Sequence, residues 1–168
     1  MLGITLFGWV HTIISLVAVF SGIISFFRFG AIIWNTTLGR TYVYATILTC
    51  LTGFFIFHHG GFGKPHVLGI ITLIVLSTAL VAGEKIKLFG RASIYIETVC
   101  YSMTFFFHLI PGVTETTTRL PVGAPWASGP DDPLVQKLVG FCFLLFVIGA
   151  TAQVIKIRSR RKALAASL

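Results

Sequence analysis

Long apolar segments, separated by short polar ones, follow one another along almost the whole chain. Five are expected at residues 6–27, 41–58, 66–83, 92–110 and 134–155. A helix needs roughly 20 apolar residues to cross the hydrocarbon core of a membrane, and these segments are close to that length. Pro111 and Gly112 are expected to end the fourth segment. The pattern predicts an all-α integral membrane bundle of five transmembrane helices in a single domain.

The composition supports a membrane protein and argues against a soluble one. Hydrophobic residues make up 55% of the chain and charged residues only 11%, whereas soluble domains carry about 25% charged residues. The net charge of +8 is compatible with nucleic-acid binding, but the basic residues lie between apolar segments rather than in a soluble domain. We therefore expect no nucleic-acid partner.

The basic residues also predict the orientation of the helices. Ten of the 13 lie between the first two segments, between the third and fourth, or after the fifth. Basic residues accumulate on the cytoplasmic side, which places the N-terminus outside and the C-terminus inside a bacterial inner membrane. Residues 111–133 then form an outer loop. Residues 156–168 form a basic cytoplasmic tail that is expected to meet anionic lipid headgroups.

This orientation gathers the five histidines of the chain near the outer side. At 1.5 Å per helical residue, all of them are expected within roughly 10 Å of the outer boundary. Imidazole is a common ligand of transition metals and of haem iron. The sequence therefore predicts a haem site at three of them and metal ligation by all five, with structural hydrogen bonding and proton transfer as alternatives. The haem candidates are His11, His66 and His108, and the metal candidates are these three with His58 and His59.

A polar stripe is predicted along the fourth segment. Glu97, Tyr101, Thr104 and His108 are spaced i, i+4, i+7 and i+11, which places them on one face of a helix. Such a stripe serves either helix packing through hydrogen bonds or a proton or electron route. A carboxylate in the bilayer needs a partner or a proton. The expected partners of Glu97 are Arg28, Tyr44 and Gln153.

Other motifs narrow the classes of function. The chain contains no phosphate-binding loop, nucleophile elbow or zinc-protease helix, so no enzyme class is predicted. Its three cysteines lie inside apolar segments and are expected to be small buried side chains. They are Cys50, Cys100 and Cys142.

Two short motifs carry a resemblance to known proteins. The second segment begins with Leu38-Gly39-Arg40-Thr41-Tyr42, and the third begins with His66-Val67-Leu68-Gly69. These stretches resemble an uncharacterised family of predicted bacterial multipass inner-membrane proteins, over about the first two-thirds of the chain. There is also a loose likeness to b-type cytochrome bundles, which ligate haem through histidines on facing helices. That likeness implies a single haem at the outer side.

Three functions are compatible with these features. The first is a redox or metal-handling protein that binds haem b or a transition metal ion through the outer histidines. The second is an accessory subunit of a larger respiratory or photosynthetic membrane complex, or a homo-oligomer, without catalysis of its own. The third is a proton or small-molecule carrier that uses the stripe from Glu97 to His108.

Overall fold

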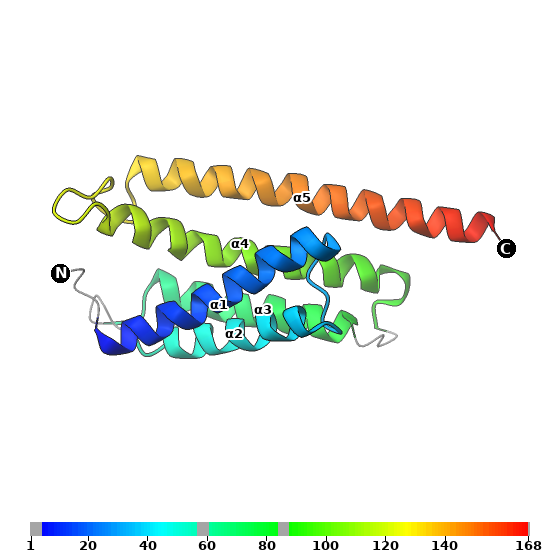
Figure 1. Ribbon diagram of the computed structural model, residues 1–168, viewed down its shortest axis with the longest axis horizontal. Coiled ribbons are helices and arrows are strands. Elements are labelled where there is room, and N and C mark those ends of the chain that lie inside the picture. Colours follow the sequence, from blue (N-terminus) through cyan, green and yellow to red (C-terminus); the bar gives the residue numbers. More distant parts are fainter. Residues whose placement is uncertain (1–4, 57–60, 84–87, 168) are drawn as a thin grey trace.

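The computed structural model describes residues 5–56, 61–83 and 88–167. Over these residues the chain is helical, without strands, and forms five α-helices and one short 3-10 helix (Figure 1). The elements are α1 (Leu6–Phe29), α2 (Thr37–Gly53), α3 (Lys64–Gly83), η1 (Gly90–Ala92), α4 (Ser93–Arg119) and α5 (Pro133–Ala166). The helices lie side by side along the long axis of the molecule.

Four of the helices are long and apolar enough to cross a membrane: α1, α3, α4 together with η1, and α5. The remaining helix, α2, has 17 residues and is therefore about 26 Å long. Large apolar side chains are exposed around the bundle, among them Phe20 (59% exposed), Ile74 (60%) and Phe141 (57%). Such a surface suits lipid as the surrounding solvent.

Helices α1 to α4 surround a common core, and α5 packs along α4 on the outside. The core contains Ala18 of α1, Tyr42 and Val43 of α2, Leu76 of α3 and Tyr101 of α4, each at most 1% exposed. Helices α2 and α4 lie across the bundle from each other, and their side chains meet at its centre. This crossing places polar groups of two distant segments in contact.

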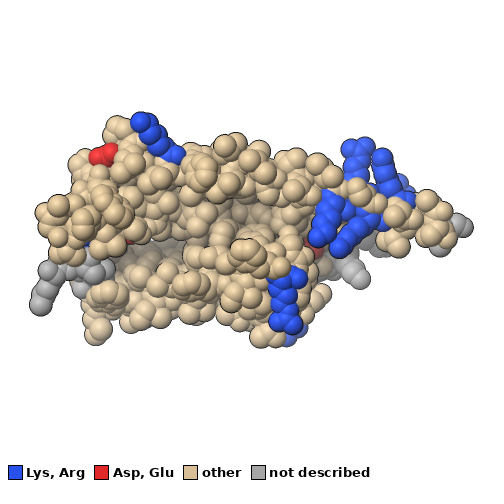
Figure 2. Space-filling model, turned by 45° about the horizontal axis from the view of Figure 1, so that its top comes forward, with Lys and Arg blue, Asp and Glu red and all other residues tan. Residues whose placement is uncertain are grey.

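The two ends of the bundle differ in charge (Figure 2). We call one the loop end, where α4 is joined to α5 by residues 120–132 and where Asp131 pairs with Lys64 of α3 at 2.8 Å. We call the other the basic end, where α1 and α3 end, α2 and α4 begin, and α5 extends past its neighbours. Lys and Arg side chains gather around that extension.

The predicted end of the fourth segment is wrong, because α4 continues through Pro111 to Arg119. Proline lacks the N–H that would bond to the carbonyl of Phe107, but a single lost bond does not end a helix that is supported by its neighbours. Threonine hydroxyls also bond back to carbonyls of the same helix, as Thr114 does to Ile110 and Thr118 to Thr114. The connection to α5 is therefore residues 120–132 and not 111–133.

Two other boundaries also differ from the prediction. Helix α2 begins at Thr37 rather than at residue 41, because Thr36 caps it by accepting a hydrogen bond from the backbone N–H of Gly39 at 3.0 Å. Helix α5 does not end near residue 155 but continues to Ala166 as one helix. The basic residues after position 155 consequently belong to α5 and not to a separate tail.

Candidate functional site: a polar seam along α4

The centre of the bundle contains two hydrogen bonds between α2 and α4. The Tyr42 hydroxyl lies 2.8 Å from Thr104 Oγ1, and Thr46 Oγ1 lies 3.0 Å from Nε2 of His108. Tyr42, Thr46 and Thr104 are fully buried, and His108 is 8% exposed. The rings of Tyr42 and His108 meet edge to face with centroids 6.0 Å apart. Four polar side chains thus fill the space between the two helices.

The threonines determine the direction of these bonds. Thr46 donates its only hydroxyl proton to the carbonyl of Tyr42 at 2.8 Å, and Thr104 donates to the carbonyl of Tyr101 at 2.9 Å. Each hydroxyl oxygen is then an acceptor toward its partner on the other helix. The phenol of Tyr42 therefore donates to Thr104, and Nε2–H of His108 donates to Thr46. This leaves Nδ1 as the basic nitrogen of neutral His108.

A second polar contact, between α1 and α2, lies nearer the loop end. Nδ1 of His11 is 2.9 Å from Thr52 Oγ1, and Ser15 Oγ is 3.4 Å from Thr49 Oγ1. Thr52 donates to the carbonyl of Leu48 at 2.7 Å, so it accepts the Nδ1–H of His11 as Thr46 accepts the Nε2–H of His108. His11 of α1 and His108 of α4 are thus each held by a threonine of α2.

Toward the basic end the same face of α4 carries Tyr101 and Glu97. Tyr101 is fully buried, and its hydroxyl has no hydrogen-bond partner among the described residues. Glu97 is half-buried against α3, where a Cβ added to Gly83 would lie 2.7 Å from the carboxylate Oε1. Glu97 therefore faces another helix of the bundle, as expected.

One of the expected partners of Glu97 is engaged elsewhere. Gln153 of α5 accepts a hydrogen bond from Ser102 at 2.8 Å and donates to the carbonyl of Gly30 at 2.9 Å. The described hydrogen bonds and ion pairs also do not join Glu97 to Arg28 or Tyr44. Gln153 instead connects α5 to α4 and to the end of α1.

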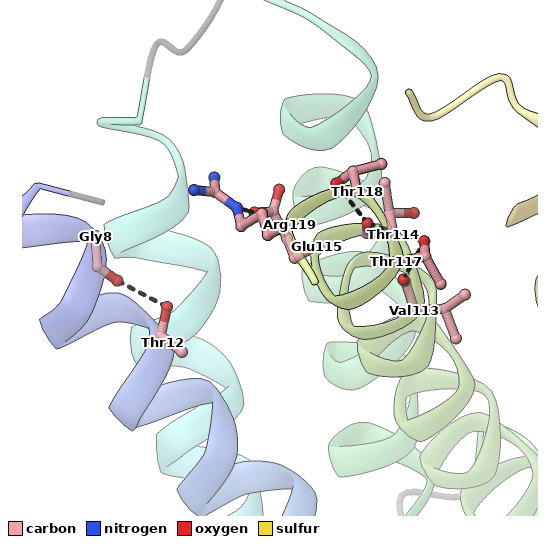
Figure 3. Close-up of polar contacts among 8 residues, drawn as sticks. All are labelled: Gly8, Thr12, Val113, Thr114, Glu115, Thr117, Thr118 and Arg119. Carbon is pink, nitrogen blue, oxygen red and sulfur yellow. Dashed lines mark hydrogen bonds and ion pairs between the residues drawn. The ribbon is translucent and has the colours of Figure 1, made fainter. Parts of the chain in front are cut away.

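We call the polar residues on this face of α4, with their partners on α2, the seam; it contains Glu97, Tyr101, Thr104 and His108 of α4 with Tyr42 and Thr46 of α2. The continuation of α4 adds Glu115, which was predicted to lie in a loop. Glu115 lies seven residues after His108, which is the same helical face, and it pairs with Arg119 one turn later (Figure 3). Figure 3 places this pair on the side of α4 toward α1, whereas Thr114, Thr117 and Thr118 lie on the other side. The i, i+7 spacing from His108 is visible in the sequence, but a helix predicted to end at Pro111 leaves Glu115 outside it.

The predicted histidine layer is distributed over several places. His108 lies 11 residues before the end of α4, which is about 16 Å along the helix. His66 is buried in the first turn of α3, where Nδ1 accepts from the backbone N–H of Gly63 at 3.2 Å and the ring stacks on Phe62. The other two predicted ligands, His58 and His59, lie outside the described residues.

The described side chains do not form a metal centre. Within residues 5–56, 61–83 and 88–167, no three His, Cys, Asp or Glu side chains are grouped so that they could hold a metal ion. The three haem candidates lie on different helices, His11 on α1, His66 on α3 and His108 on α4, and each ring is hydrogen-bonded to a different partner. A haem at these histidines stays a prediction of the sequence. Metal ligation that involves His58 or His59 stays a prediction of the sequence.

The helical architecture and the apolar surface indicate the class of multipass α-helical membrane proteins. Comparison with protein-family models, curated proteins and solved structures finds no match to this chain. The resemblance through the two helix-entry motifs therefore stays a prediction.

Proposed function

We propose that this protein is a multipass membrane protein that conducts protons along the seam, between Glu115 at the loop end and Glu97 at the basic end. The loop end faces the outside and the basic end the cytoplasm, as the distribution of basic residues favours. A bacterial inner membrane is the proposed location. The observation that carries the proposal is a line of ionisable and hydroxyl groups on one face of α4 that meets hydrogen-bonding side chains of α2.

The length of this line matches the membrane. Glu97 and Glu115 are 18 residues apart on one continuous helix, which is about 27 Å at 1.5 Å per residue. The hydrocarbon core is about 30 Å thick. A carboxylate at each end would exchange protons with the adjacent water, and the interior side chains would carry them between the two.

The buried part of the seam contains groups that both donate and accept protons. His108 donates from Nε2 to Thr46 and can accept a proton at Nδ1, which makes the ring a relay. Tyr42 and Thr104 form the next hydrogen-bonded pair toward the basic end. Beyond them lies Tyr101, whose buried hydroxyl would cost about 1–3 kcal/mol if left unsatisfied. A water at that hydroxyl would continue the route toward Glu97.

Proton flux into liposomes tests the proposal. Purified protein is reconstituted into vesicles loaded with a pH-sensitive dye, and a potassium gradient with valinomycin supplies the driving potential. The pH inside the vesicles is expected to change faster than in protein-free vesicles, in the direction set by the imposed potential. The His108→Gln variant should lower the rate about 100-fold or more, the lower bound for loss of a positioned proton-transfer group.

Matched variants separate conduction from folding. His66→Gln changes another buried histidine that lies outside the seam, and it should conduct like the parent protein. Thr46→Val keeps the shape of its side chain but removes the acceptor for His108, so it should slow conduction without loss of the folded bundle. Wild-type vesicles as impermeable as protein-free ones would refute proton conduction, as would an unchanged rate for His108→Gln.

The exposed surface of α5 favours a second candidate function, assembly with another membrane subunit. Only 6% of the most apolar 18-residue stretch of α5 is buried, against 33% for α4. Phe141, Leu144 and Ile148 are each more than half exposed on α5. Mass determination after gentle detergent extraction tests this candidate. A complex larger than the monomer is expected if α5 is an interface, and a monomer alone would contradict it.

A further inference from the structure

The basic end contains cationic side chains that have no anionic counterpart within the described chain. Both described ion pairs, Lys64–Asp131 and Arg119–Glu115, lie at the loop end. Glu97 is the only described acidic residue toward the basic end. At this end, the cations without a carboxylate partner among the described residues are Arg28, Arg40, Arg91, Lys156, Arg158, Arg160, Arg161 and Lys162.

Two of these cations share a face of α5 that turns toward the end of α1. Gln153 reaches the carbonyl of Gly30 at 2.9 Å, and a Cβ added to Gly30 would lie 3.4 Å from Nζ of Lys156. Arg160 follows Lys156 by one helical turn and Gln153 by two, so it extends the same face. Arg28 lies in the last turn of α1. Lys156 thus lies where α5 passes the end of α1, with Arg160 one turn further along α5 and Arg28 in the last turn of α1, its guanidinium 5.4 Å from the ring centroid of Phe29.

Neighbouring cations are engaged differently. The guanidinium of Arg161 donates to the carbonyl of Arg91 at 2.8 Å and lies 5.9 Å from the ring centroid of Tyr95. That side chain is directed to the start of α4. Lys156 and Arg160 are exposed and make no comparable contact with the part of the chain that the structure describes, so they are accessible to an anion.

The depth of these residues corresponds to the headgroup layer. Helix α5 has 34 residues and is about 51 Å long, so roughly 20 residues cross the hydrocarbon core and the rest extends beyond it. With the core ending near residue 154, Lys156 and Arg160 lie about 3 to 9 Å beyond it, at the level of lipid phosphates. The guanidinium carbon of Arg40 lies over the ring of Trp34, 6.0 Å from the ring centroid. Tryptophan is enriched at the interface between membrane and water.

We propose that Lys156 and Arg160 of α5, with Arg28 of α1, form a binding site for the headgroup of an anionic phospholipid in the cytoplasmic leaflet. The phosphate pairs with the ammonium and guanidinium groups, and the acyl chains lie along the exposed apolar surfaces of α1 and α5. Such a lipid would lie between α5 and the end of α1, which are joined there by the hydrogen bond from Gln153 to Gly30. The site is independent of proton conduction.

Lipid titration followed by native mass spectrometry tests this site. The whole protein in neutral detergent is titrated with phosphatidylglycerol, with phosphatidylcholine and, separately, with inorganic phosphate. Phosphatidylglycerol should bind with the highest affinity. Each of Lys156→Gln and Arg160→Gln should weaken that binding about fivefold. The control Lys137→Gln removes a cation from the loop-end part of α5 and should leave the affinity unchanged.

Three outcomes would overturn the proposal. Equal affinity for phosphatidylglycerol and phosphatidylcholine would show that charge does not matter. If Lys137→Gln weakens phosphatidylglycerol binding as much as the other two variants do, the binding is not specific to Lys156 and Arg160. Binding of inorganic phosphate as strong as that of phosphatidylglycerol would show a free-anion site rather than a lipid site.

Discussion

Gly39 allows an unusually close approach between the start of α2 and the preceding connection. A Cβ at this position would lie 1.9 Å from the carbonyl oxygen of Ile33, a distance that real Cβ contacts do not reach. The obstacle is backbone rather than a flexible side chain, so it cannot move away cheaply. This explains in physical terms why glycine stands in the Leu38-Gly39-Arg40 motif.

Substitution of Gly39 by alanine should therefore destabilise the bundle. We expect Gly39→Ala to lower the free energy of unfolding by about 1–3 kcal/mol, the usual cost of inserting a methyl group into a filled site. The control is Gly140→Ala, because a Cβ there meets nothing within 4 Å. Alanine at a helical position should be neutral or stabilising by up to roughly 1 kcal/mol. Denaturant unfolding in detergent measures both, and equal stability of the two variants would contradict the expectation.

Asp132 gives a pH-dependent contribution at the start of α5. Hydrogen bonds from the backbone N–H of Ser128, the backbone N–H of Leu134 and the Ser128 hydroxyl lower the pKa of its carboxyl group. A carboxyl whose pKa is lower in the folded state stabilises the fold above its unfolded pKa, and this contribution is lost as the pH falls through the folded value.

Variants at Asp132 make this testable. We expect Asp132→Ala to be less stable than the parent protein at neutral pH, with a difference that shrinks as the pH falls below about 4. Asp132→Asn retains a good capping side chain but cannot titrate, so the pH-dependent part should be missing. Thermal unfolding as a function of pH measures the difference. A stability difference between the parent protein and Asp132→Ala that does not change with pH would show that ionisation of the Asp132 carboxyl group is not its cause.

At the scale of elements, α5 is a long helix attached along one side of the bundle. It packs along α4, and its polar attachment includes Gln153, which bridges Ser102 of α4 and Gly30 of α1. Arg161 adds a second polar attachment to the backbone at Arg91. An element with so few buried side chains depends more than the others on such contacts.

A double-mutant cycle measures the contribution of the bridge. Ser102→Ala and Gln153→Ala should be coupled by about 0.6 kcal/mol, the average found for interhelical hydrogen bonds in a membrane protein. Thr78→Ala serves as the reference, because the Thr78 hydroxyl bonds to Ile74 of its own helix. Its effect should simply add to that of Gln153→Ala. Zero coupling would show that the hydrogen bond between Ser102 and Gln153 does not stabilise the bundle.

At the scale of the whole molecule, the charge asymmetry of the two ends predicts the orientation in the membrane. Among the described residues, Asp131 and Asp132 lie at the loop end, and most of the cations without carboxylate partners lie at the basic end. Since cytoplasmic loops carry the excess of Lys and Arg, we expect the loop end outside and the basic end inside.

Cysteine labelling in intact cells tests this orientation. Cys50, Cys100 and Cys142 are first replaced by serine or alanine. Ser128→Cys in the α4–α5 loop should react with a membrane-impermeant maleimide from outside. Ser159→Cys near the end of α5 should react only after permeabilisation. The reverse pattern would invert the topology, and labelling of both sites from one side would show that α5 does not cross the membrane.

The α4–α5 region shows where sequence reasoning was insufficient. Pro111 and the threonines after it have the composition of a loop, and the sequence does not reveal that neighbouring helices support a helix through the proline. Once α4 continues to Arg119, Glu115 falls into register with His108. The stripe from Glu97 to His108 was predictable, since it depends only on the 3.6-residue period.

The sequence by itself determined the helical class, the apolar segments and the polar face of α4, because hydropathy and helical period are properties of local stretches of chain. The tertiary structure alone decided which groups meet that face. Tyr42 and Thr46 reach Thr104 and His108 from a helix more than 50 positions away in the chain, and Gln153 reaches α1 rather than Glu97. Contacts between distant segments depend on how helices rotate and cross when their side chains pack, and no local pattern contains that information.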